Sequence, residues 1–187
     1  MRKPSLLCIV GPSCAGKTTV ATIISELTGL KVISASNYPR RRHSTTGLNM
    51  PLLEYVEREF TDKGLDTFAK ELVLDLERDW IDHGGVGYVI DGFRAVEEVD
   101  LLAHKIGSTS TLGVFADSRT RFSRNIIRDK VSAITDYSKF VEKDLIEYGF
   151  GIAKLMAYYA KPVLVNEGDL PSLKGGLTPI VRGLGTS

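Results

Sequence analysis

The stretch SLLCIVGPSCAGKTT, residues 5–19, decides the fold class of this 187-residue chain. Residues 5–10 form an apolar run that Gly11 and Pro12 end, which predicts a strand buried on both faces of a sheet. Residues 11–18 match the pattern G-x-x-x-x-G-K-[ST] in full, and residues 18–27 show helical character. Backbone N–H groups of such a loop converge on phosphate oxygens, and the positive end of the helix reinforces them. The sequence therefore predicts a P-loop that binds a nucleotide.

The loop residues have expected roles with ATP and Mg²⁺ as ligands. Lys17 would reach the β- and γ-phosphates and act in catalysis, and the Thr18 hydroxyl would bind Mg²⁺. Asp91 ends an apolar strand expected beside the P-loop strand, where a carboxylate organises Mg²⁺ and its waters or acts in catalysis. The expected nucleotide-binding residues are Gly11, Ser13, Cys14, Ala15, Gly16, Lys17, Thr18 and Thr19.

The composition is that of an ordinary globular domain. Hydrophobic residues make up 43% and charged residues 25% of the chain, which argues against wholesale disorder. The net charge is only +1, which weakens the case for a general nucleic-acid binder. Two cysteines, Cys8 and Cys14, are too few for a secreted disulfide scaffold, and no apolar run approaches the ~20 residues of a membrane span. The first apolar stretch is too short for a signal peptide, so we expect a cytoplasmic protein.

Apolar strands alternate with helical segments along the chain. Strands are expected at residues 5–10, 31–34, 86–90, 111–116 and 162–165. Helices are expected at residues 18–27, 64–83, 96–106, 119–130 and 140–160, the last with a break near Gly149 and Gly151. The alternation predicts an α/β fold with a five-stranded parallel sheet flanked by helices. The polar segment at residues 37–50 is expected to be a loop, and residues 175–187 a frayed tail.

Two turns resemble those of the nucleoside monophosphate kinases, which have an adenylate-kinase-like P-loop fold. ISASNYPR at residues 33–40 is similar to the family's I-S-T-G-D-x-x-R, and DGFR at residues 91–94 to its D-G-F-P-R turn without the proline. In this resemblance Asn37 stands where the family favours aspartate. The resemblance implies that Arg40 and Arg94 grip the phosphate of an acceptor. The expected substrate-binding residues are Asn37, Arg40, Arg41 and Arg94.

The C-terminal half is more similar to an archaeal P-loop family described as dephospho-coenzyme-A-kinase-like. The stretches that carry this resemblance are VFAD at 114–117, TRFSR at 120–124, FVEKD at 140–144 and VNEG at 165–168. Arg121, Arg124 and Arg128 are spaced so that they share one face of a helix. The resemblance implies that Arg124 and Arg128 belong to a lid over the donor and stabilise the moving phosphoryl group. The alternative is a solvated face whose charge is balanced by Asp117 and Asp129.

The expected layout is a single kinase domain, residues 1–187, with a helical acceptor-binding insertion at about 37–83 and a lid at about 119–144. Lys143 is the expected later cation of the lid. The expected function is ATP-dependent transfer of the γ-phosphoryl group to a small phosphorylated acceptor, such as a nucleoside monophosphate. The turn at residues 34–38 supports this acceptor, because cations follow it closely and it has no carboxylate to act as a base.

Three alternatives stay open. The first is a kinase for a hydroxyl acceptor, such as dephospho-coenzyme A or a modified base in a polynucleotide, with Asp91 as the base. The second is a nucleotide-gated regulatory protein with little turnover. The third is a nucleic-acid-binding NTPase that uses the basic run at residues 40–43 as a phosphate grip.

Overall fold

The computed structural model describes residues 5–83, 87–128 and 133–184 of the chain. Its centre is a five-stranded sheet in the order β2-β3-β1-β4-β5, and its neighbouring strands pair in parallel, as predicted. The strands are β1 (Leu6–Val10), β2 (Lys31–Ser34), β3 (Tyr88–Asp91), β4 (Thr109–Phe115) and β5 (Val163–Val165). Val86, the expected first residue of β3, lies outside the described residues.

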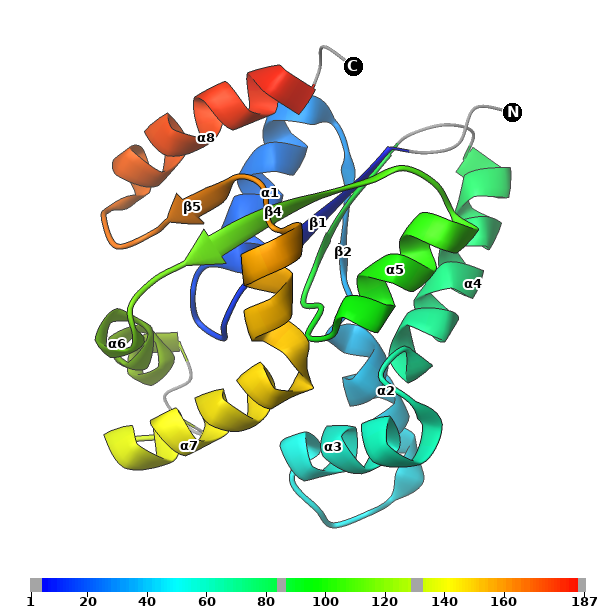
Figure 1. The fold of residues 1–187 in the computed structure, drawn as a ribbon, viewed down its shortest axis with the longest axis vertical. Coiled ribbons are helices and arrows are strands. Elements are labelled where there is room, and N and C mark those ends of the chain that lie inside the picture. Colours follow the sequence, from blue (N-terminus) through cyan, green and yellow to red (C-terminus); the bar gives the residue numbers. More distant parts are fainter. Residues whose placement is uncertain (1–4, 84–86, 129–132, 185–187) are drawn as a thin grey trace.

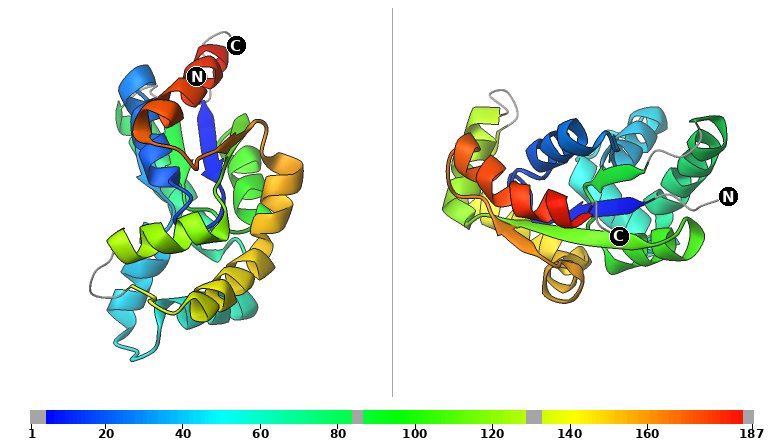
Figure 2. Two further views of the ribbon diagram at one scale, coloured as in Figure 1. Left: turned by 90° about the vertical axis from the view of Figure 1, so that its left-hand side faces the viewer. Right: turned by 90° about the horizontal axis from the view of Figure 1, so that it is seen from above.

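Helices cover both faces of the sheet (Figures 1 and 2). They are α1 (Lys17–Thr28), α2 (Asn37–Thr46), α3 (Leu52–Lys63), α4 (Thr67–His83), α5 (Val96–Lys105), α6 (Ser118–Arg128), α7 (Tyr137–Glu147) and α8 (Leu170–Leu184), with the π-helical turns η1 (Tyr148–Ile152) and η2 (Leu155–Tyr159). Helices α1 and α8 lie against each other on one face, whereas α4, α5 and η2 pack on the other. In the part of the chain that is described, no helix is long and apolar enough to cross a membrane.

Strand β1 shows why both faces of the sheet are covered. All of its residues are buried, as its continuous apolar run predicts. Leu7 and Ile9 belong to the core that α1 and α8 cover, while Leu6, Cys8 and Val10 belong to the core on the α4 and α5 side. Because successive side chains of a strand point to opposite faces, a strand with helices on both sides has to be apolar throughout.

The carboxyl ends of the strands bring several polar segments to one edge of the sheet. The P-loop follows β1, helix α2 follows β2, and the turn at residues 92–95 follows β3. In the parallel register Asp91 lies beside Ile9 of β1 and Ser34 of β2. Figure 1 shows helices α2, α3, α6 and α7 beyond this edge. Ligands of open parallel sheets bind at such an edge.

Residues 37–46 form a helix, which corrects the loop predicted at residues 37–50 for all but its last four residues. Helix α2 has a very polar sequence, but Tyr38 and Pro39 are buried. Arg42 pairs with Glu59 of α3 and with Glu71 of α4. Burial and long-range ion pairs therefore stabilise a helix that the hydrophobic pattern does not indicate. Helix α3 lies within the predicted helical insertion, although the sequence pattern does not give its bounds.

The C-terminal segment is also ordered where a frayed tail was expected from residue 175. Helix α8 covers it up to Leu184, and residues 185–187 lie outside the described residues. Leu173 and Leu177 are buried against the α1 side of the sheet. Their spacing of four residues places both on one face of the helix, so apolar packing outweighs the low helix propensity of Gly175 and Gly176.

The predicted break in the helix near Gly149 and Gly151 is confirmed. Gly151 has a φ of 134° inside η1. A Cβ atom at Gly151 would lie 3.3 Å from the Cα of Ala95 and 3.3 Å from the carbonyl oxygen of Arg94. Glycine at this position therefore lets the segment after α7 rest directly against the turn that follows β3.

Leu177→Ala tests whether α8 is an integral part of the core. Leu177 is fully buried, so we expect its truncation to lower the free energy of unfolding by about 2–5 kcal/mol. Leu170→Ala, at a residue that is 50% exposed in the same helix, is the matched control and should cost much less. The measurement is chemical denaturation of both variants. Equal small losses for the two would show that α8 is not packed as described.

Candidate active site

The P-loop has the backbone geometry that its motif requires. Gly11 has a φ of 145°, and a Cβ atom there would lie 2.1 Å from the carbonyl oxygen of Val114 in β4. Helix α1 begins at Lys17, directly after the loop. Asn166, which follows β5, donates a hydrogen bond of 2.8 Å from its side-chain amide to the carbonyl oxygen of Ala15. The loop is thus held in place by β4 and by the residue that follows β5, and α1 begins directly after it.

Lys17 lies over its own loop. Its Nζ donates hydrogen bonds to the carbonyl oxygens of Gly11, at 2.8 Å, and Pro12, at 2.9 Å. Burial lowers the pKa of Lys17 to about 8, against the opposing effect of the Glu147 carboxylate. Since an anion next to the ammonium group would favour its charged form, Lys17 is suited to bind phosphate oxygens.

Thr18 and Asp91 form the expected pair for a magnesium ion. The Thr18 hydroxyl donates a hydrogen bond of 2.5 Å to Oδ2 of Asp91, which is 2% exposed. The other oxygen, Oδ1, is buried and has no hydrogen-bond partner among the described residues. The described residues hold no group of three or more His, Cys, Asp or Glu that could cage an ion. Two protein oxygens, completed by phosphates and water, fit the coordination of Mg²⁺.

These residues face a cavity of about 450 Å³ at the carboxyl edge of the sheet. Of the predicted nucleotide-binding residues, Gly11, Ser13, Cys14, Lys17 and Thr18 line it, whereas Ala15, Gly16 and Thr19 do not. The predicted acceptor residues Asn37, Arg40 and Arg94 line the same cavity, as do Asp91, Arg128, Lys143 and Glu147. The structure therefore joins the predicted donor and acceptor sites in one space.

Three arginines from separate elements approach one another in this cavity. Burial, and then the charges of Arg94 and Arg128, lower the pKa of Arg40. Arg40 donates from Nη1 to the Ser36 carbonyl, at 3.1 Å, and to the Ser36 hydroxyl, at 2.5 Å. The buried Nε of Arg94 has no hydrogen-bond partner among the described residues. A cluster of guanidinium groups with free donors is the arrangement that binds phosphate or carboxylate.

Arg41 does not line this cavity, and its role in substrate binding stays a prediction. Its guanidinium pairs with Glu71, at 3.1 Å, and with Asp75, at 3.7 Å, and it does not line the cavity. Arg42 also points to α3 and α4, through Glu59 and Glu71. Because α2 is helical, successive residues point in different directions, and only Arg40 of this basic run faces the cavity.

The three arginines of α6 differ in their surroundings. Arg128 lines the cavity, whereas Arg124 does not, and the buried Nη1 of Arg124 has no hydrogen-bond partner in the described part of the chain. Arg121 is 2% exposed and forms an ion pair with Asp144 of α7. Arg121 also donates to the carbonyl oxygen of Ser13, at 3.2 Å. It is a buried link between the P-loop and α7, so the three arginines share one face of α6 but have different surroundings. Asp129, expected to balance them, lies outside the described residues.

Glu147, at the end of α7, is a site residue that sequence reasoning missed. Its Oε2 accepts a hydrogen bond of 2.7 Å from the Ser13 hydroxyl. Its Oε1 lies 3.6 Å from Nη2 of Arg94 and 4.0 Å from Nζ of Lys143. Burial raises the pKa of Glu147, but Arg94, Lys143 and the Ser13 hydrogen bond outweigh it, so the pKa lies below its usual range. The spacing of four residues from Lys143 is the only signal in the sequence for this position.

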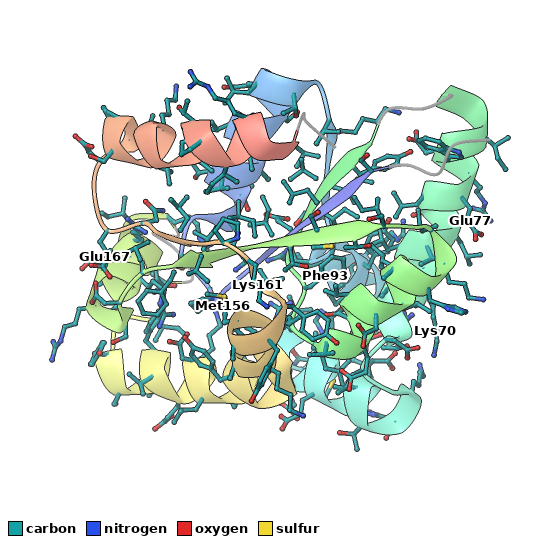
Figure 3. All side chains as sticks on the ribbon, turned by 45° about the horizontal axis from the view of Figure 1, so that its top comes forward. Lys70, Glu77, Phe93, Met156, Lys161 and Glu167 are labelled. Atoms are coloured by element: carbon teal, nitrogen blue, oxygen red, sulfur yellow. The ribbon has the colours of Figure 1, made fainter. Side chains whose placement is uncertain are left out.

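Glu98, in the first turn of α5, holds the turn that carries Arg94. Its Oε2 accepts hydrogen bonds from the backbone N–H groups of Arg94, at 2.7 Å, and Ala95, at 3.0 Å. Phe93, labelled in Figure 3, is 1% exposed and anchors the same turn in the core. Burial raises the pKa of Glu98 to about 7, against the lowering effect of the two backbone hydrogen bonds. The position of Arg94 thus depends on a buried carboxyl group.

Solved structures similar to this chain are kinases. A sugar kinase from Janibacter sp. HTCC2649 superposes with a TM-score of 0.61 at 17% identity, covering 96% of this chain and 98% of its own. A shikimate kinase from Acinetobacter baumannii, in complex with shikimate, gives a TM-score of 0.59 at 16% identity and covers 99% and 96%. A gluconokinase from Sinorhizobium meliloti 1021 gives 0.62 at 14% identity and covers 98% and 97%. The chain therefore shares the fold of these proteins, the α/β P-loop fold that its sequence predicted.

Sequence relatives define the family more narrowly. No family model matches the chain. A UPF0200 protein from Methanopyrus kandleri is 30% identical over 182 residues, which are 96% of this chain and 90% of the relative. A UPF0200 protein from Pyrobaculum aerophilum is 30% identical over 163 residues, 87% of this chain and 88% of the relative. The chain belongs to the UPF0200 family. The finer resemblance to nucleoside monophosphate kinases stays a prediction.

Glu98→Gln tests the buried carboxyl group beneath Arg94. The pKa of Glu98 is about 7 in the folded protein, against an ordinary value of 4.5. Between pH 4.5 and about 7 the folded state therefore keeps a proton on Glu98 that the unfolded state has lost. Wild-type stability should therefore fall as pH rises from 4.5 to above 7, by about 3 kcal/mol in total from this group. Glutamine stays neutral, so Glu98→Gln should lack this fall, while Glu97→Gln, at an exposed neighbour, should keep it.

The measurement is the free energy of unfolding by urea at a series of pH values for the wild type and both variants. The same pH dependence in wild type and Glu98→Gln would contradict the proposed state of this group.

Proposed function

We propose that this protein is an ATP-dependent phosphotransferase that moves the γ-phosphoryl group of ATP to a small phosphorylated acceptor, such as a nucleoside monophosphate or a similar nucleotide. One observation carries the proposal: the P-loop lysine, the Thr18–Asp91 pair and the arginines Arg40 and Arg94 line one cavity. Donor and acceptor phosphates held there would lie within reach of each other, which is the main requirement of phosphoryl transfer.

The donor half of the site is the P-loop. Its backbone N–H groups and the N-terminus of α1 would bind the phosphates, and Lys17 would bind the β- and γ-phosphate oxygens. Thr18 and Asp91 would hold Mg²⁺, which supplies positive charge to the phosphate oxygens when bound. Arg128, on α6, extends the positive charge of the cavity and would stabilise the charge of the group in transfer. Helices α6 and α7 would act as the lid.

The acceptor half is formed by α2 and by the turn after β3. Arg40 and Arg94 face the cavity from these two elements, and the segment at residues 34–40 has no acidic side chain. A phosphate acceptor already carries a nucleophilic oxygen anion, so it needs cations to hold it rather than a base. The Nε of Arg94, which has no hydrogen-bond partner among the described residues, is suited to such a contact. Helices α2 and α3 would form the acceptor-binding insertion.

A hydroxyl acceptor that also carries an anionic group is the second candidate. Asp91 favours it, because its buried Oδ1 has no hydrogen-bond partner among the described residues and would accept a proton. The structural neighbours include a gluconokinase and a shikimate kinase bound to shikimate. Asp91→Asn, assayed at saturating Mg²⁺, discriminates between the candidates. Transfer to a hydroxyl acceptor should be lost because the base is missing, whereas transfer to a phosphate acceptor needs no base and should continue.

The proposal is tested by ADP production from ATP with a panel of acceptors. The panel contains nucleoside monophosphates, dephospho-coenzyme A, small hydroxy acids and short oligonucleotides. At least one acceptor should raise ADP production well above the rate with ATP alone. Lys17→Ala should lower that rate by about 100-fold or more, because the developing charge loses its nearest fixed cation. Full turnover by Lys17→Ala would refute the P-loop assignment, and acceptor-independent ADP release would favour a regulatory or nucleic-acid-binding NTPase.

Arg40→Ala and Arg94→Ala test the acceptor site separately from the donor site. Each variant removes a charge-assisted contact worth about 1.5–3 kcal/mol, so the double variant should raise the acceptor KM by more than about 100-fold. The KM for ATP should change little. Arg41→Ala is the matched control, because Arg41 is the adjacent residue but pairs with Glu71 and Asp75 outside the cavity. Equal effects of Arg40→Ala and Arg41→Ala would contradict the assignment.

A further inference from the structure

Glu147 places a negative charge inside a cavity built for anions. It is 2% exposed, and it lines the cavity together with Lys17, Arg94 and Lys143. A carboxylate repels phosphate groups, so its presence weakens the binding of the ligands for which the cations are arranged. Such a residue calls for a reason beyond charge balance.

The contacts of Glu147 join the two halves of the site. One oxygen accepts a hydrogen bond of 2.7 Å from Ser13 of the P-loop, and the other lies 3.6 Å from Nη2 of Arg94. This contact involves Nη2 of Arg94, whereas its buried Nε has no hydrogen-bond partner in the described residues. We infer that Glu147 is a positioning residue that fixes Arg94 relative to the P-loop while leaving Arg94 free to bind the acceptor. This inference rests on the function proposed above.

The surrounding structure holds Glu147 in this place. Three residues earlier in α7, Asp144 pairs with the buried Arg121, which donates to the carbonyl oxygen of the same Ser13. Just after Glu147, Gly151 lies against the backbone of Arg94 and Ala95, too close for a side chain to fit without displacement. Helix α7 is thus linked to the P-loop through Arg121, and the turn η1 that follows it lies against the Arg94 turn. Glu147 lies between these two contacts.

The charge of Glu147 and the reach of its side chain are expected to affect different measured quantities. The charge of Glu147 lowers the affinity of the cavity for phosphate anions whether or not transfer occurs. Its reach from Ser13 to Arg94 affects only the alignment of donor and acceptor, and hence kcat. A neutral residue of the same length removes the first effect and the ion pair to Arg94. A charged residue that is one methylene shorter keeps the charge and loses the reach.

The test compares Glu147→Gln and Glu147→Asp, with Glu142→Gln as the control on an exposed residue of the same helix. The first measurement is the affinity for inorganic pyrophosphate by calorimetry. Glu147→Gln should bind pyrophosphate about fivefold more tightly than wild type or better, because a like charge is removed. Glu147→Asp and Glu142→Gln should stay within about twofold of wild type. Unchanged or weaker binding by Glu147→Gln overturns the inference.

The second measurement is kcat with an acceptor from the panel. Glu147→Gln and Glu147→Asp should both lower kcat by about tenfold or more, with KM for ATP unchanged or lower, because Arg94 is no longer held in register with the P-loop. A loss of fold alone would weaken pyrophosphate binding as well, which the first measurement excludes. Wild-type kcat in both variants overturns the inference. If Glu147→Gln does not fold, Ser13→Ala removes the same link from the loop side and should lower kcat alike; no change there overturns the inference.

Failure of the proposed function gives a different result from failure of this inference. If no acceptor in the panel is phosphorylated, the kinase proposal fails, but the pyrophosphate measurement still decides whether Glu147 opposes anions in the cavity. If an acceptor is phosphorylated and Glu147→Gln behaves as wild type in both measurements, the kinase proposal stands and the inference fails.

Discussion

Mutual repulsion among cations at the carboxyl edge of the sheet is the constraint on which the site depends. Arg40, Arg94 and Arg128 face one cavity from three separate elements, and the latter two lower the pKa of the first. Like charges that face one cavity repel one another, so they stay close only where the fold holds them in place and opposite charges lie nearby. The cavity walls supply two carboxylates, Asp91 and Glu147, and the remaining positive charge is available to an anionic ligand.

Asp91 and Glu147 are held by different parts of the structure, so the two sides of the cavity differ in what positions them. Asp91 ends a central strand and is hydrogen-bonded to Thr18 in the first turn of α1, so the donor side is built on the sheet itself. Glu147 ends a helix that contacts the rest of the protein through the pair of Asp144 with Arg121, among other contacts, and the turn after it lies against the Arg94 turn at Gly151. The Asp91 side of the cavity is therefore built on the sheet, whereas the Glu147 side depends on how helices pack against it.

The sequence predicts the parts of this site that a local motif defines. The P-loop, Asp91 and Arg94 follow apolar strands directly, so the strand pattern alone places them at one edge. Arg40 could not be separated from Arg41, because the choice depends on the phase of a helix that burial and long-range ion pairs with Glu59 and Glu71 stabilise. Arg121 pairs with Asp144, which is 23 residues away, and Glu147 with Ser13, which is 134 residues away. The periodicity of the sequence carries no information on contacts between residues so far apart.

The central claim is that this cavity passes a phosphoryl group from one bound anion to another. The most direct measurement follows the γ-phosphoryl group of isotopically labelled ATP by phosphorus NMR, with Mg²⁺ and each anionic acceptor in turn. The account predicts that the label leaves ATP when an acceptor is present and appears on that acceptor in a new phosphoanhydride or phosphate ester. Label that appears only as inorganic phosphate, at a rate that no acceptor changes, would contradict the account.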